Sequence, residues 1–267
     1  MLPDLQPLYV APAVIFGLMF GSFLNVCIYR IPRDLSVVAP RSFCPECGER
    51  IAWHDNVPLL SYAVLRGHCR ACGKRIGSRY PIVELSTAIL FTAVAIRYGW
   101  TVSALKWALF EAVVITLFWT DIEERILPDE LTLGGALIGL MLALLVRVPG
   151  ELAGLFLPGP KMVWQSLFNA GVGATVLAGP IWMLGFIYAR VRGREGLGLG
   201  DVKLLVLLGV FLGLENGLLA LLIGVLSGSV IGIAYIWLTR KKASTYELPF
   251  GSFLCAGAAL VPLVHKL

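Results

Sequence analysis

Residues 217–238 read GLLALLIGVLSGSVIGIAYIWL, without a single charged side chain. A helix needs about 20 apolar residues to cross the hydrocarbon core of a bilayer, so this stretch is long enough to span a membrane. Similar runs recur along the chain, in which 58% of residues are hydrophobic and only 15% are charged. This composition, with a mean hydropathy of +0.81, lies outside the soluble range and predicts a polytopic membrane protein.

The apolar runs predict an all-α fold with about eight transmembrane helices. We expect the spans at 8–29, 81–98, 101–119, 131–148, 168–189, 202–214, 217–238 and 250–265. Gly213 and Asn216 lie between the sixth and seventh runs, so these two could form a tight hairpin or one broken unit. The first run follows Asp4 rather than a basic cluster, and we expect it to be a retained span rather than a signal peptide.

Lysine and arginine gather in alternate connections between these spans. The basic connections are the segment 30–79, Arg125, the segment 190–194 and the segment 240–242. With eight spans all of them fall on one side, which the positive-inside rule assigns to the cytoplasm, with both termini outside. The net charge of +5 is therefore a signal of topology, and we expect membrane lipid rather than nucleic acid as its partner.

The first predicted cytoplasmic loop, residues 30–80, contains two C-x-x-C pairs. The four cysteines are Cys44, Cys47, Cys69 and Cys72. Four thiolates with this spacing can close a tetrahedral zinc site, and the glycine that follows each pair suits the tight turn. Two disulfides are the alternative, which a reducing cytoplasm disfavours. The loop is therefore expected to be a zinc-ribbon-like domain.

Two aspartates lie at predicted cytoplasmic helix ends. Asp121 closes the third span, and Asp201 opens the sixth behind Gly198 and Gly200. If the helices bring these carboxyls together, an ionised aspartate can activate water while a protonated one polarises a scissile carbonyl, as in an aspartic protease. The two glycines let the backbone bend sharply and approach an extended peptide.

Other functions for these acidic residues stay open on the residues alone. The glycine-rich run lacks the G-x-x-x-x-G-K-[ST] pattern of a phosphate loop, and no strand is predicted before it. A carboxylate just outside a span is often solvated or caps a helix. A transporter or assembly scaffold that couples ions through such residues is a non-enzymatic alternative.

Six motifs in order along the chain resemble the bifunctional bacterial prepilin peptidases, which are GxGD aspartic proteases of family A24. The motifs are Gly21-Ser-Phe-Leu-Asn25-Val-Cys-Ile-Tyr-Arg30-Ile-Pro32, the two C-x-x-C pairs, Ser78-Arg79-Tyr80-Pro81-Ile-Val-Glu84, Asp121 with Leu127-Pro128-Asp129-x-x-Thr132, Gly198-x-Gly200-Asp201, and Glu247-Leu-Pro249-Phe250-Gly251. The sequence departs from the usual family pattern at Glu123, where aspartate is usual, and at Ser252, where proline is frequent. We expect the change at Ser252 to affect helix entry more than chemistry.

The resemblance implies an enzyme of the bacterial inner membrane with its active site at the cytoplasmic face. It would remove the basic leader of type IV prepilins or type II secretion pseudopilins and then N-methylate the new N-terminal residue with S-adenosylmethionine. Asp121 and Asp201 would be the catalytic pair, with Glu123 and Lys203 in supporting roles beside the two glycines. The four cysteines would hold a structural Zn²⁺. A GxGD protease with a different substrate is the enzymatic alternative.

This resemblance also implies a division of the chain into three parts. Residues 1–29 would form the first transmembrane helix. Residues 30–80 would form the cysteine-rich loop linked to methyl transfer, and residues 81–267 would form the peptidase domain.

Overall fold

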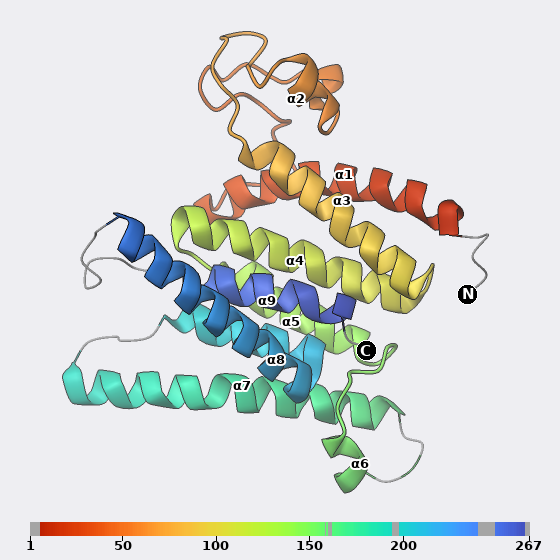
Figure 1. Ribbon diagram of the computed structural model, residues 1–267, viewed down its shortest axis with the longest axis vertical. Coiled ribbons are helices and arrows are strands. Elements are labelled where there is room, and N and C mark those ends of the chain that lie inside the picture. The colour runs from red at the N-terminus through yellow and green to blue at the C-terminus, as the bar shows by residue number, and fades with distance from the viewer. Residues whose placement is uncertain (1–5, 158, 160–161, 194–197, 240–248, 265–267) are drawn as a thin grey trace. The chain divides into compact units, whose positions relative to one another are not determined.

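A computed structural model describes residues 6–157, 159, 162–193, 198–239 and 249–264. The described residues are helical except for loops, and their only β-structure is two isolated bridges. The chain divides into two compact units, Met1–Thr116 and Leu117–Leu267. The predicted all-α class is therefore confirmed (Figure 1).

The first unit is built on the packing of two long helices and carries the cysteine-rich segment between them. Its helices are α1 (Gln6–Arg30), η2 (Ile31–Arg33), η3 (Trp53–Asn56), α2 (Leu60–Val64), α3 (Arg79–Tyr98) and the first part of α4 (Val102–Glu124). Glycine lets α1 and α3 approach closely, because a Cβ at Gly21 would lie 2.6 Å from the Cα atom of Glu84. This crossing fixes the end of α1 next to the start of α3.

The second unit is organised around one long helical element. It contains the end of α4 and α5 (Asp129–Leu142), α6 (Leu152–Phe156), α7 (Met162–Arg192), α8 (Leu199–Thr239) and α9 (Phe250–Val264). Helix α8 packs against α5, α7 and α9. Gly209 of α8 faces the backbone of Gly173 in α7 so closely that a Cβ on either residue would collide with the other helix.

Helix α8 is broken at Gly213. The backbone there is non-helical, with φ 73° and ψ −174°, a left-handed conformation that favours glycine. A Cβ at this position would also collide with the carbonyl oxygen of Pro149. The predicted sixth and seventh runs are therefore two helical segments that meet at Gly213, the residue that sequence analysis placed between them.

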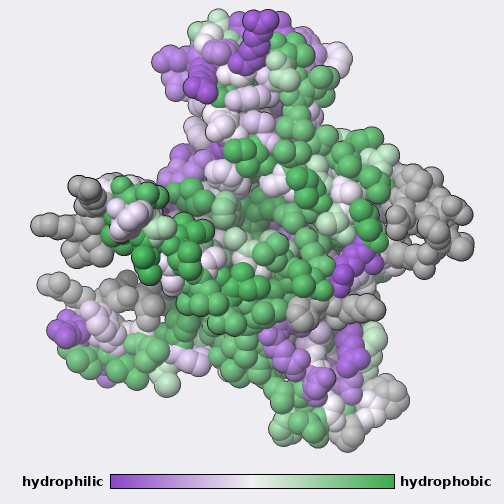
Figure 2. Space-filling view, viewed as in Figure 1, coloured by the Kyte–Doolittle hydropathy of each residue, from purple (hydrophilic) through white to green (hydrophobic). Residues whose placement is uncertain are grey.

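Among the residues that the structure describes, five helices are long and apolar enough to cross a membrane. They are Val10–Arg33, Arg79–Tyr98, Val102–Glu124, Met162–Arg192 and Leu199–Thr239. Helix α9 is a shorter apolar helix, and α5 is shorter than the predicted fourth run. Eight spans stay a prediction. Figure 2 shows apolar side chains over the exposed helix faces and hydrophilic ones on the segment between α1 and α3.

Some sequence features lie outside the described residues. They include Arg194, the basic segment 240–242 and Glu247 of the last motif.

Candidate functional site

Asp121 lies in the last turns of α4 and is buried, with 7% of its surface exposed. Its Oδ2 atom accepts two hydrogen bonds from the first turn of α9. The backbone N–H of Ser252 donates at 2.6 Å and the Ser252 hydroxyl donates at 2.7 Å. The hydroxyl oxygen also lies 3.0 Å from the carbonyl oxygen of Phe118, so its single hydrogen has two possible acceptors.

Asp201 lies in the first turn of α8, where its backbone N–H donates to the carbonyl of Gly198 at 3.2 Å. Its side chain is half-buried, and its charge interacts with that of Asp121. The Cys255 thiol, fully buried in α9, lies near both carboxyls. The tertiary structure thus brings together the two aspartates that sequence analysis singled out.

Leu127 packs against the first turn of α8, which carries Asp201, and against the first turn of α9, which contacts Asp121. A Cβ at Gly200 would lie 3.3 Å from the Cβ of Leu127, and a Cβ at Gly251 would lie 3.0 Å from its Cδ1. A Cβ at Gly251 would also lie 3.2 Å from the carboxyl carbon of Asp121. Glycine is therefore required for close packing here, because any larger residue would displace Leu127 or the carboxyl.

Lys203 and Glu123 lie differently with respect to this pair. The Nζ atom of Lys203 donates to both carboxylate oxygens of Asp129, at 2.6 and 2.8 Å, and so joins the first turn of α8 to the first turn of α5. Glu123 is exposed, two residues beyond Asp121. Two residues correspond to about 200° around a helix, so Glu123 projects away from the side occupied by Asp121. The supporting role of each stays a prediction.

The four cysteine sulfurs of the first unit form one cluster. The Sγ atoms of Cys44, Cys47, Cys69 and Cys72 all lie within 4.8 Å of one another. Those of Cys44 and Cys72 are 4.0 Å apart. Zn–S bonds of about 2.3 Å in a tetrahedron place sulfurs about 3.8 Å apart, so the cluster is compatible with a structural zinc ion. All four are free thiols, the form from which zinc ligands arise.

The cluster is made by two copies of one local motif, residues 43–51 and 68–76, which we call the knuckles. In each, the glycine after the second cysteine donates its N–H to the carbonyl of the first, at 2.8 Å for Gly48 and 2.9 Å for Gly73. Both glycines have a positive φ, 71° and 69°. Backbone N–H groups of Cys72 and Ala71 lower the pKa of the Cys69 thiol to about 7, which favours the ligating thiolate.

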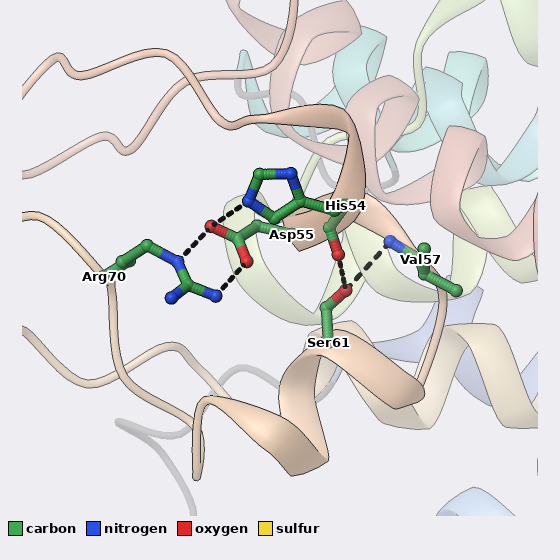
Figure 3. A network of polar contacts seen from close by, with 5 residues as sticks. All are labelled: His54, Asp55, Val57, Ser61 and Arg70. Atoms are coloured by element: carbon green, nitrogen blue, oxygen red, sulfur yellow. Dashed lines mark hydrogen bonds and ion pairs between the residues drawn. The ribbon is translucent and has the colours of Figure 1, made fainter.

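A polar network holds the second knuckle to η3 and α2 (Figure 3). The Arg70 guanidinium donates two hydrogen bonds of 2.7 Å to the carboxylate of Asp55 and lowers its pKa. The Ser61 hydroxyl accepts from the backbone N–H of Val57 at 3.0 Å and donates to the carbonyl of His54 at 2.9 Å. The bidentate geometry restricts how the knuckle can move relative to η3.

Comparison with known proteins places the chain in a family. Residues 15–98 match the bacterial peptidase A24 N-terminal domain, and residues 107–233 match the type IV leader peptidase family. A prepilin leader peptidase/N-methyltransferase of Myxococcus xanthus is 39% identical over 90% of this chain and 67% of its own length. Proteins of the same name from Pseudomonas putida and Neisseria gonorrhoeae are 35% and 34% identical, and the alignments cover 89% and 91% of them.

The chain belongs to the type IV leader peptidase family. The family resemblance and the enzyme class inferred from the motifs are therefore confirmed. No solved structure matches the chain.

Within this leader peptidase fold, sequence reasoning missed the contacts around the aspartates. Ser252 was expected to affect helix entry, yet it donates two hydrogen bonds to Asp121. Leu127 was noted only as part of a motif, although it packs against Gly200 and Gly251. No sequence signal indicates either contact, because each joins segments that are distant in the chain.

Proposed function

We propose that this protein is a bifunctional prepilin peptidase and N-methyltransferase whose proteolytic pair is Asp121 and Asp201. The observation that carries the proposal is that two carboxyls, from the end of α4 and the start of α8, lie near enough for their charges to interact. Gly198 leaves space beside Asp201, because the one atom near a Cβ built there would be the Asp201 Oδ2 atom, at 3.7 Å. An extended substrate backbone can therefore approach Asp201 closely.

The hydrogen bonds around the pair favour different roles for the two aspartates. Oδ2 of Asp121 accepts two hydrogen bonds from Ser252, and such donors stabilise an ionised carboxylate. We therefore assign Asp121 as the base that removes a proton from the attacking water, and Asp201 as the protonated partner that polarises the scissile carbonyl. The water oxygen bonds to the carbonyl carbon, the C–N bond breaks, and the leaving nitrogen gains a proton.

The supporting residues would keep this pair in place. The ion pair of Lys203 with Asp129 fixes the first turn of α8 against α5, and Asp201 lies in that turn. Leu127 fills the space that Gly200 and Gly251 leave. These contacts act on the first turn of α8, which carries Asp201, and on the first turn of α9, which holds Asp121 through Ser252. Small displacements at these residues would therefore change the distance between the carboxyls.

The substrate and location are inferred from the family and from charge. The basic connections predict that the pair faces the cytoplasm at the inner membrane. The substrates are prepilins, which the relatives' name mentions, or pseudopilins. The four cysteines would bind a structural Zn²⁺, and S-adenosylmethionine would donate the methyl group.

Substitution of each aspartate by asparagine tests the peptidase assignment. Purified Asp121→Asn and Asp201→Asn variants should each fail to cleave a purified prepilin, because neither asparagine can transfer a proton. Glu130→Gln is a matched control, since Glu130 is an exposed carboxylate in the first turn of α5. Cleavage that survives in both aspartate variants would exclude a catalytic pair and favour a transporter or scaffold.

A second experiment separates prepilin peptidase from other GxGD proteases. A prepilin whose glycine before the cleavage site is replaced by a larger residue should be cleaved much more slowly. Equal cleavage of both prepilins would favour a protease with another natural substrate.

A further inference from the structure

A cavity of about 700 Å³ lies in the first unit between the α1–α3 pair and the two knuckles. All of its lining residues fall within positions 22–84, so it contains neither Asp121 nor Asp201. We call it the helix–knuckle cavity. Its volume lies within the range of about 300 to 1,000 Å³ that is typical of small-molecule sites. The proteolytic function assigns no role to this cavity.

One wall of the cavity carries a buried acceptor without a donor. Asn25 lines the cavity, is 2% exposed, and has no hydrogen-bond partner for its Oδ1 atom among the described residues. The orientation of the amide is fixed, because Nδ2 donates to the carbonyl oxygens of Gly21 at 3.3 Å and Tyr80 at 3.1 Å. A flipped amide would place its oxygen against two acceptors. Oδ1 is therefore available to a ligand that donates hydrogen bonds.

A buried carboxylate from α3 lines the same cavity. Glu84 is 7% exposed, and its Oε2 atom accepts the backbone N–H of Leu59 at 2.8 Å. It follows Tyr80, the partner of Asn25, by one helical turn, and a Cβ at Gly21 would collide with its backbone. An acceptor oxygen on α1 and a carboxylate on the facing part of α3 favour a cationic group that donates hydrogen bonds.

The remaining lining residues include tyrosines, which can pack against a flat aromatic ring, and arginines, which can pair with a carboxylate. Tyr29, Tyr62 and Tyr80 contribute aromatic side chains from α1, α2 and α3. Arg50 and Arg75 come from equivalent positions of the two knuckles. A ligand that combines an aromatic ring with both an ammonium and a carboxylate group would thus find complementary chemistry throughout the cavity.

We propose that the helix–knuckle cavity is the site for S-adenosylmethionine, with Asn25 and Glu84 receiving its α-ammonium group. The tyrosine side chains would cover the adenosine, and the arginines of the knuckles would face the α-carboxylate. This assignment rests on the methyltransferase half of the proposed function. In this assignment the knuckles form part of the donor site, because Cys44, Cys69 and Arg70 line the cavity.

The methyl transfer itself needs no group beyond the donor and the amine. The lone pair of the new N-terminal amine forms an N–C bond to the methyl carbon as the C–S bond breaks. The electrons of the broken bond stay on sulfur, which becomes a neutral thioether, and the methylated ammonium releases a proton to water. The cavity contributes by holding the donor in one orientation.

Binding of radiolabelled S-adenosylmethionine to full-length protein in lipid nanodiscs tests the proposal by equilibrium dialysis. Glu84→Gln keeps the shape and an acceptor oxygen but removes the charge, and it should weaken binding by about tenfold or more. Asp34→Asn is the control, because Asp34 is an exposed carboxylate of the same unit that does not line the cavity. Its donor affinity should equal that of the wild type.

Cleavage of prepilin by Glu84→Gln should stay at the wild-type rate, which also reports that the variant is folded. Equal donor affinity of Glu84→Gln and the wild type would overturn the proposal. So would the absence of saturable donor binding to the wild type. Because aspartate-dependent cleavage is measured in the same samples, failure of the donor site is distinguished from failure of the peptidase assignment.

Photolabelling of the unmodified protein provides a test that needs no substitution. Ultraviolet cross-linking of radiolabelled S-adenosylmethionine, followed by peptide mapping, should place the label within residues 22–84. Label confined to other peptides would overturn the proposal. Displacement of the donor by a short phenylalanyl peptide but not by S-adenosylhomocysteine would also overturn it, since the cavity would then be the site of the methyl acceptor.

Discussion

Replacement of Ser252 by alanine tests whether the hydroxyl at the start of α9 positions the carboxylate of Asp121. The substitution removes the 2.7 Å hydrogen bond from the hydroxyl and keeps the 2.6 Å bond from the backbone N–H. A hydrogen bond to a charged group contributes about 1.5 to 3 kcal/mol. The hydroxyl has a second possible acceptor in the Phe118 carbonyl at 3.0 Å, so we take the lower limit.

A loss of about 1.4 kcal/mol in the transition state lowers a rate about tenfold, and we expect this decrease in kcat for prepilin cleavage by Ser252→Ala. KM should stay unchanged, because the Ser252 hydroxyl acts on the rate through its hydrogen bond to Asp121 and not through substrate binding. A purified prepilin, followed by gel densitometry or mass spectrometry over a range of concentrations, gives both constants. Ser252→Thr retains a hydroxyl and should restore most of kcat.

The matched control is Ser227→Ala, which removes a hydroxyl whose hydrogen bond, 3.1 Å long, goes to the carbonyl of Gly224 within α8. It should cleave like the wild type. A Ser252→Ala variant with kcat within twofold of the wild type would refute the positioning role. An equal decrease in Ser252→Ala and Ser252→Thr would attribute the effect to packing.

Three further predictions follow from close contacts and from the cysteine cluster. Gly251→Ala should reduce cleavage about tenfold or more, because its Cβ would press on Asp121 and Leu127, whereas Gly134→Ala, with open space around it, should cleave normally; equal rates would show that the turn adjusts freely. Gly213→Ala should destabilise the kink of α8 by about 1 to 3 kcal/mol and so lower the midpoint of thermal unfolding. Gly171→Ala in α7 is the control, because a Cβ there would meet no neighbouring atom. An unchanged midpoint in Gly213→Ala would contradict the requirement for glycine at the kink. Elemental analysis should find about one zinc ion per chain, lost in Cys69→Ser but retained in Cys27→Ala, while prepilin cleavage persists in both; intact disulfides without metal would contradict the zinc site.

The membrane class and both candidate sites could be predicted from local sequence. Uncharged runs such as 217–238 have to be buried in lipid wherever the rest of the chain lies, so length and composition are sufficient. The cysteine knuckles are also local, since the glycine turn that aims two sulfurs at one point is encoded within a few residues. Asp121 and Asp201 were recognisable from their motifs and from their places at helix ends.

Only the tertiary structure could decide which groups surround these sites. Ser252 and Asp121, like Asn25 and Tyr80, are neighbours only because helices pack, and the packing depends on many contacts whose combination no short motif encodes. The same is true of the ion pair between Lys203 and Asp129. Sequence determined which residues can perform the chemistry, because side-chain chemistry and helix length are local properties. Helix packing determined which groups these residues contact, and it left Oδ1 of Asn25 without a hydrogen-bond donor among the described residues. The reason is that contacts between distant segments exist only in the folded chain.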